Sequence, residues 1–228
     1  MQESSSLLHT AEVVHWAALI IMAVVYSLRL RWLFKFKPGA DKSAPGNPGY
    51  TDKKKGAFYS VFNVAMPWSM ESTRKGFAFY LTFVIFHVGV VAGLTLAFLS
   101  TITPNLVADP VFAWICGGSL FLAFLVAIYR VFRRLFKPVM KLISTPDDYF
   151  SLFMLTAWFG LGVVTQAHLA GAAGFESVNI LVAYLFLTSF FLIYVPFSKI
   201  SHYLYYPFTR IWIGRALGHR GSYPIARG

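Results

Sequence analysis

Five long apolar stretches separated by short polar segments dominate the chain. They cover about residues 13–34, 77–100, 111–132, 149–169 and 178–206. A bilayer core about 30 Å thick needs roughly 20 apolar residues of helix to cross it, because backbone polar groups in hydrocarbon must be satisfied within the segment. The pattern therefore predicts an all-α fold: a single domain, 1–228, that is an integral membrane bundle of five transmembrane helices.

The segments between and after the predicted spans are unequal. Residues 35–76 are rich in Gly, Pro and Lys and contain the turn signal Pro45-Gly46-Asn47-Pro48-Gly49, so we expect a polar loop. Residues 207–228 follow the fifth span and are expected to form a tail. The fifth stretch is long enough to tilt in the bilayer or to emerge from it.

The basic residues all fall on one side of this topology. Of the 20 Lys and Arg residues, ten lie in 29–75, five in 130–141 and five in 199–227, and none lies in 101–110, 171–177 or the N-terminal segment. Basic residues near span ends stay on the cytoplasmic side. We therefore predict an N-terminus outside and a cytoplasmic C-terminus, with loop 35–76 and tail 207–228 also in the cytoplasm.

Charge and composition restrict the partners. The formal charge of +11 indicates this topology and an attraction to anionic membrane lipid, so it calls for no nucleic acid. A basic inner face also suits an acidic protein partner. Because 57% of the residues are hydrophobic and 13% are charged, a soluble domain is excluded. Cys116 is the only cysteine, so any cysteine-ligated iron–sulfur centre must belong to a partner.

Four of the six histidines lie in or at the predicted spans: His15, His87, His168 and His202. An ionisable side chain inside a membrane marks a candidate functional site, although a single histidine also serves as a hydrogen-bonding residue between helices. His87 and His202 both fall in the cytoplasmic half, on the second and fifth spans. Two neutral imidazoles from facing helices can supply both axial ligands of a haem iron, so we predict that this pair binds haem b.

Two glycines and two basic residues near this pair each have two possible roles. Gly89 and Gly93 would let a flat macrocycle approach the helix backbone, or they would serve ordinary helix packing. Lys199 and Arg210 are candidates to pair with haem propionates, and the alternative is that they are ordinary basic residues flanking the span.

Two motifs resemble a known family. Phe86-His87-Val88-Gly89 is similar to F-H-x-G, and Pro196-Phe197-Ser198-Lys199-Ile200-Ser201-His202 is similar to P-F-S-(K/R)-x-x-H. Both occur in the gamma (cytochrome b) subunit of respiratory nitrate reductase and in related membrane cytochrome b subunits of heterodisulfide-reductase-like complexes. The resemblance implies that His87 and His202 ligate the haem nearer the cytoplasm, which exchanges electrons with an iron–sulfur partner.

The same resemblance predicts a difference at the outer side. The family's outer haem uses two histidines whose positions are occupied here by Ala97 and Tyr184, so a second haem bound in the usual way is not expected. His15 and His168 lie at similar depth near the outer ends of the first and fourth spans. Three roles stay open for them: ligands of an outer haem, part of a quinone pocket with Glu12 or Gln166, or interfacial histidines bonded to water.

Together these observations predict a cytochrome b subunit of a respiratory oxidoreductase complex in a bacterial or archaeal cytoplasmic membrane. It would carry electrons between membrane quinone, such as menaquinone, and an iron–sulfur or other redox subunit on the cytoplasmic face. One haem b is expected and a second is possible. The subunit would not be a complete enzyme. The competing hypotheses are a non-haem transporter or proton-relay protein and a structural membrane anchor.

Overall fold

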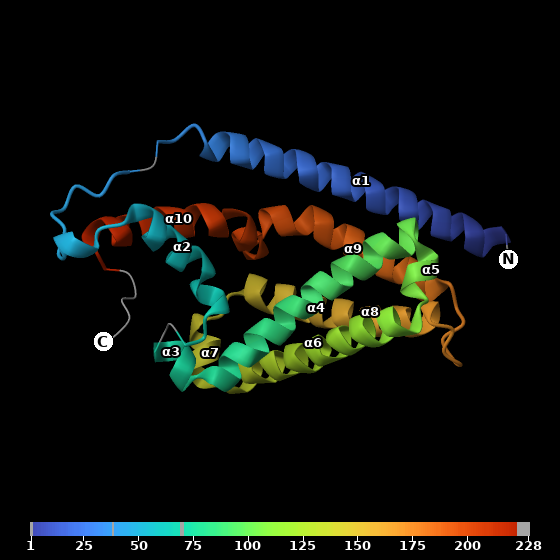
Figure 1. Cartoon of the computed structure of the whole chain (residues 1–228). Helices are drawn as coiled ribbons and strands as arrows, with labels where there is room; N and C mark the ends of the chain where they lie inside the picture. The colour runs from blue at the N-terminus through green and yellow to red at the C-terminus, as the bar shows by residue number, and fades with distance from the viewer. Residues whose placement is uncertain (1, 38, 69–70, 223–228) are drawn as a thin grey trace. The chain divides into compact units, whose positions relative to one another are not determined.

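The computed structural model describes residues 2–37, 39–68 and 71–222, and every regular element in those ranges is helical (Figure 1). Five of the described helices are long and apolar enough to cross a membrane: Ser6–Leu33, Phe77–Ile102, Pro110–Phe136, Pro146–Leu169 and Asn179–Phe197. The prediction of an all-α, multi-pass membrane protein is therefore confirmed.

The helices alternate between long spans and short connecting turns. In chain order they are α1 (Gln2–Leu33), η1 (Pro48–Tyr50), α2 (Lys53–Phe62), η2 (Asn63–Ala65), α3 (Glu71–Lys75), α4 (Phe77–Ile102), α5 (Pro104–Val107), α6 (Pro110–Phe136), α7 (Pro138–Ile143), α8 (Pro146–Leu169), α9 (Asn179–Tyr194), η3 (Val195–Phe197), η4 (Lys199–Ser201) and α10 (His202–Arg220).

Two of the long helices begin at a polar residue followed by proline. The Asp109 carboxylate accepts hydrogen bonds from two backbone N–H groups in the first turn of α6. At the start of α8, the Asp148 carboxylate accepts from the backbone N–H of Thr145 at 2.8 Å and from its hydroxyl at 2.9 Å. Pro110 and Pro146 lack an N–H that the first turn would leave unpaired, so this sequence pattern sets where the two spans start.

The chain forms two compact units. The first unit comprises Met1–Met22 and Leu81–Tyr194, and the second unit comprises Ala23–Tyr80 and Val195–Gly228. Helix α1 therefore contributes its first part to the first unit and its last part to the second. The single domain expected for 1–228 stays a prediction.

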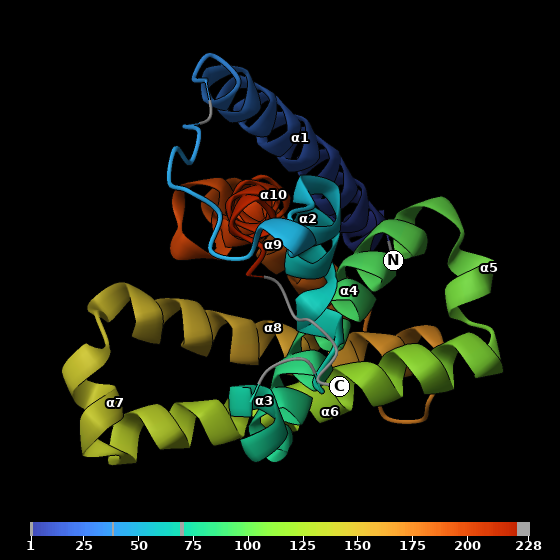
Figure 2. The same cartoon turned by 60° about the vertical axis from the view of Figure 1, so that its left-hand side comes forward.

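In the first unit, α6 packs along α8 and α8 packs against α9 (Figures 1 and 2). Its core contains the fully buried side chains of Leu120, Phe159 and Tyr184. Around these side chains, polar groups of neighbouring helices pair with one another: the Trp158 indole N–H donates to the Thr188 hydroxyl at 2.8 Å. Such pairing is needed because an unsatisfied donor in an apolar interior costs about 1–3 kcal/mol.

In the second unit, α2 lies alongside α10 (Figures 1 and 2). Glycines make this contact possible: a Cβ built on Gly56 would lie 2.7 Å from the Cα of Gly218 and would also collide with the carbonyl oxygen of Gly214. No real side chain fits at such distances, so the two helix backbones touch directly. Beside this contact, the Tyr206 hydroxyl donates to the Val61 carbonyl at 3.0 Å and the Arg210 Nε donates to the Ser60 carbonyl at 2.8 Å.

Three predicted boundaries differ from the structure. The fifth stretch, 178–206, is not one helix, because α9 ends at Tyr194 and two 3-10 turns precede α10. Pro196 lies in the first of these turns, where its missing N–H cannot continue the helix. Segment 35–76 contains α2 and α3, and α10 extends through the expected tail until Gly221, whose φ of 70° ends it. Residues 223–228 of that tail lie outside the described residues.

Candidate functional site

His87 is a half-buried residue of α4 in the first unit. Its Nδ1 lies 2.8 Å from the backbone carbonyl oxygen of Phe83, one turn earlier, and its ring centroid lies 4.2 Å from that of Phe83. A carbonyl oxygen only accepts, so Nδ1 must carry the proton and the lone pair of the neutral imidazole is on Nε2. This is the arrangement in which metal-binding histidines are commonly oriented by a carbonyl group.

His202 shows the same arrangement in the second unit. It is the first residue of α10, it is exposed, and its Nδ1 lies 3.1 Å from the carbonyl oxygen of Lys199. The serines of the motif build the preceding turn: the Ser198 hydroxyl accepts from the backbone N–H of Ile200 at 3.2 Å, and the Ser201 hydroxyl donates to the Ser198 carbonyl at 2.8 Å. The motif therefore sets the position of His202 and leaves its Nε2 with the lone pair.

The two histidines belong to different units. His87 lies within Leu81–Tyr194, whereas His202 lies within Val195–Gly228. Each ring has the tautomer that a haem ligand needs, and their pairing across one iron stays a prediction.

The glycines beside His87 serve helix packing. A Cβ at Gly93 would lie 2.6 Å from the ring of Trp158 on α8, and a Cβ at Gly89 would collide with the Cβ of Ala123 on α6. Both glycine faces are therefore occupied by neighbouring helices. Of the two readings that the sequence allowed, the structure supports close packing and leaves no room for a macrocycle on these faces.

A cation that was not among the predicted site residues lies next to the F-H-x-G motif. The Arg130 guanidinium of α6 stacks over the Phe86 ring, with its carbon 4.6 Å from the ring centroid. Its Nε is buried and has no hydrogen-bond partner among the described residues. Such a donor in an apolar span calls for an anionic or polar ligand. The available signal was its position as the first basic residue at the inner end of the third span.

The two predicted propionate partners differ. The Arg210 Nε donates to the carbonyl oxygen of Ser60 at 2.8 Å, so this side chain ties α10 to α2 within the second unit. Lys199 begins the 3-10 turn before His202, and its carbonyl accepts from that histidine. Arg210 thus has a structural role, and its other guanidinium nitrogens remain candidates for an anion.

His15 has the most unusual environment of the candidate residues. Its side chain in α1 has zero exposure, and neither ring nitrogen has a hydrogen-bond partner among the residues that the structure describes. It packs against the rings of Phe98, 5.0 Å away between centroids, and Trp16, 6.2 Å away. One turn earlier, Ala11 lies in an apolar cluster with Leu181, Val182 and Leu185 of α9. A neutral imidazole carries one donor and one acceptor, and both are unsatisfied here.

His168, the predicted companion of His15, is held by the connection after α8. Its Nδ1 lies 2.6 Å from the carbonyl oxygen of Phe175, so Nδ1 donates and Nε2 carries the lone pair. Both residues belong to the first unit. Within the described ranges, no hydrogen bond or ring contact joins the two histidines. Gln166 is buried nearby in α8, donates from Nε2 to the carbonyl of Val107 at 2.8 Å, and has an unpaired Oε1.

Ala97 and Tyr184, the two positions at which the resembling cytochrome b family has its outer histidines, are both buried in the helix packing. Ala97 is fully buried on α4. Tyr184 is also fully buried, and its hydroxyl donates to the carbonyl oxygen of Gly93 at 2.7 Å. Tyr184 therefore joins α9 to α4 within the first unit.

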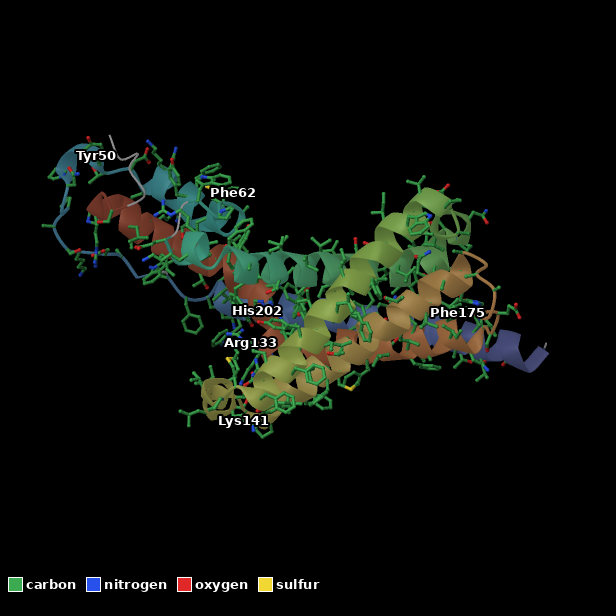
Figure 3. All side chains as sticks on the ribbon, turned by 90° about the horizontal axis from the view of Figure 1, so that it is seen from below. Tyr50, Phe62, Arg133, Lys141, Phe175 and His202 are labelled. Atoms are coloured by element: carbon green, nitrogen blue, oxygen red, sulfur yellow. The ribbon has the colours of Figure 1, made fainter. Side chains whose placement is uncertain are left out.

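The ends of the first unit differ in charge. Figure 3 shows Arg133 and Lys141 at one end and Phe175 at the other. The first end carries the five basic residues of 130–141, and the connections at the second end, 103–109 and 170–178, contain no Lys or Arg. This asymmetry gives the unit a basic end and an opposite end without basic residues.

Comparison with known proteins gives one distant relative and no family. A protein of Nitratidesulfovibrio vulgaris (strain Hildenborough) is 23% identical over 221 residues, which cover 93% of this chain and 91% of the relative. No protein-family model matches the chain, and no solved structure matches it. The aligned region covers nearly the whole of both chains.

Proposed function

We propose that this chain is the haem b membrane subunit of a respiratory oxidoreductase complex, with His87 and His202 as the axial ligands of the inner haem iron. The observation that carries the proposal is the tautomer shared by the two histidines. Each donates its Nδ1–H to a backbone carbonyl three or four residues earlier, which presents Nε2 as the metal-binding nitrogen. Both lie in the motifs that resemble the cytochrome b family.

The surroundings of the F-H-x-G motif also offer a positive charge that could pair with a haem propionate. The buried, unpaired Nε of Arg130 is a suitable partner for a carboxylate such as a haem propionate. Lys199 and Arg210 are further candidates for the same role. Bound haem would supply a one-electron carrier between membrane quinone and a redox partner. His87 and His202 would hold the iron, and Arg130, Lys199 and Arg210 would neutralise the propionates.

The basic end of the first unit supports an orientation with the N-terminus outside and the C-terminus in the cytoplasm of a bacterial or archaeal cell. In that orientation the inner haem faces an iron–sulfur or other redox subunit on the cytoplasmic side. A fluorescent protein fused to the C-terminus should fluoresce, and an alkaline phosphatase fused there should be inactive. A dark fluorescent-protein fusion together with an active phosphatase fusion would place the C-terminus outside the cytoplasm.

The unpaired nitrogens of His15 favour a ligand at the outer side as well. We propose that His15 hydrogen-bonds a ring oxygen of quinone, with Gln166 as a second polar group, because two unsatisfied groups of this kind are costly in an apolar interior. His168 can instead serve as a haem ligand through Nε2. The His15→Phe variant separates the two roles: loss of quinol oxidation with unchanged haem indicates quinone, whereas loss of haem indicates an outer haem.

The decisive experiment is the haem content of protein purified from membranes. Wild-type protein should show a reduced b-type spectrum, and both His87→Ala and His202→Ala should remove the inner haem. His219→Ala is the matched control, because that histidine also bonds a backbone carbonyl, that of Ser43, but lies outside both motifs. A colourless wild-type preparation, or full haem content in His202→Ala, would favour a transporter or a structural anchor.

A further inference from the structure

A groove with a volume of about 840 Å³ lies within the second unit, between the segment that follows α1 and one face of α10. Two contacts hold the segment over the helix. The Trp212 indole N–H donates to the carbonyl oxygen of Gly39 at 2.8 Å, and the rings of Phe34 and Phe208 meet edge to face with centroids 5.3 Å apart. The groove is therefore a formed feature with an apolar, aromatic wall.

The groove also carries unneutralised positive charge. Lys37, Lys53 and Arg215 line it, are exposed, and form no ion pair with any of the residues that the structure describes. The acidic lining residue, Asp41, is already paired with Arg220 at 2.5 Å. The Arg220 guanidinium and the Ser43 donors hold the pKa of Asp41 well below its usual range, so this carboxylate stays ionised and cannot neutralise the other three cations.

The groove lies at the end of a candidate membrane span, which is where lipid headgroups are expected. Its lining begins at Leu33, the last residue of α1, where a candidate membrane span ends and a basic segment starts. Lys and Arg side chains at this level attract anionic headgroups, and aromatic side chains there contact the upper part of acyl chains.

We propose that this groove binds one anionic phospholipid, with the phosphodiester headgroup held by Lys37, Lys53 and Arg215 and an acyl chain lying along Phe34, Phe208 and Trp212. A guanidinium and two ammonium groups complement the phosphate, and the aromatic wall complements the glycerol and chain. The site lies wholly in the second unit and does not depend on haem binding.

Lipid binding to the full-length protein in detergent tests this site. By native mass spectrometry, wild-type protein should retain phosphatidylglycerol in preference to phosphatidylcholine. The triple variant Lys37→Gln/Lys53→Gln/Arg215→Gln should lose affinity for phosphatidylglycerol by about fivefold for each charge removed. The matched control is Arg74→Gln/Lys137→Gln/Lys141→Gln, which removes three exposed basic residues outside the groove and should bind like wild type.

An equal loss in both triple variants would show only general charge attraction and would overturn the proposal, as would wild-type lipid affinity in the groove variant. Loss of an acidic protein subunit with unchanged lipid binding would mean that the groove docks a protein instead. A photoreactive phosphatidylglycerol supplies a test on unmodified protein: crosslinks should map to 33–41 or 205–219, and crosslinks confined to other segments would refute the site. Haem content is measured on the same samples. Failure of the lipid proposal can therefore be told apart from failure of the haem proposal.

Discussion

The first and second units both bring helices together through glycine, but they differ in what surrounds the contact. In the first unit, Gly93 receives the Trp158 ring, and the nearby polar groups bond one another inside an apolar core. In the second unit, Gly56 receives the backbone of α10, and charged side chains bond the backbone around it. The comparison teaches that glycine at a helix contact serves two settings: an apolar core in the first unit and a contact flanked by a basic side chain in the second.

The largest expected effect follows from the backbone contact in the second unit. Gly56→Ala would place a methyl group against the backbone of Gly214 and Gly218, which cannot rotate away, so we expect a destabilisation of about 3 kcal/mol. The thermal unfolding midpoint in detergent measures it. Gly118→Ala is the control, because nothing lies within 4 Å of a Cβ there and helix propensity should raise stability. An unchanged unfolding midpoint in Gly56→Ala would show that the backbones of α2 and α10 are not in direct contact at this position.

The corresponding change in the first unit should cost less. Gly93→Ala meets the Trp158 ring at 2.6 Å, and a side chain can shift where a backbone cannot. The ring is held by its bond to Thr188, so the cost should still be about 1–2 kcal/mol in the same thermal assay. If Gly93→Ala lost more stability than Gly56→Ala, the helix contact in the first unit would be the less tolerant of the two, contrary to this expectation.

Removal of a single buried hydrogen bond should have a smaller effect. Tyr184→Phe deletes the donor to the Gly93 carbonyl without changing the shape of the core, and should cost about 1 kcal/mol. Tyr149→Phe is a matched control in the same unit, because the Tyr149 hydroxyl is 3.4 Å from its acceptor on Arg134. Equal midpoints for the two variants would mean that the Tyr184 bond adds nothing to the first unit.

The smallest effect is expected at the surface of the second unit. The pKa of Asp41 is lowered by Arg220, so the ion pair stabilises the folded state above the carboxyl's ordinary pKa of 3.8, and this stabilisation is lost as the pH falls below that value. Asp41→Asn should therefore lower the unfolding midpoint slightly at pH 7 in low salt. The difference from wild type should stay constant between pH 7 and pH 5, begin to shrink only below pH 3.8, and vanish in 1 M salt; a difference that persists in 1 M salt would exclude the ion pair as its cause.

Much of the fold was readable from the sequence because the bilayer imposes a local rule. Each span must satisfy its own backbone, so a long apolar run with Asp109-Pro110 or Thr145-Pro146 before it specifies a helix and its start without reference to any partner. The break before His202 was harder to predict, since hydropathy continues through 178–206 and only Pro196 marks it.

Helices α2 and α3 of the second unit were not predicted, for a different reason. Segment 35–76 is polar and rich in Gly and Pro, which suggests a loop when read alone. Helix α2 is stabilised there by the Asp52 cap, whose side chain accepts from the Lys54 and Lys55 N–H groups, and by packing against α10, about 150 residues later in the chain. A contact between such distant segments leaves no periodic signal in either of them.

The sequence by itself determined the helical class, the number of long apolar helices and the identity of the candidate histidines, because span length and residue chemistry are local properties. Only the tertiary structure decided which polar atoms are left without partners. Two nitrogens of His15 and the Nε of Arg130 are unsatisfied because neighbouring helices supply rings and not acceptors. That outcome depends on which side chains the folded helices place next to one another, and no stretch of sequence specifies it alone.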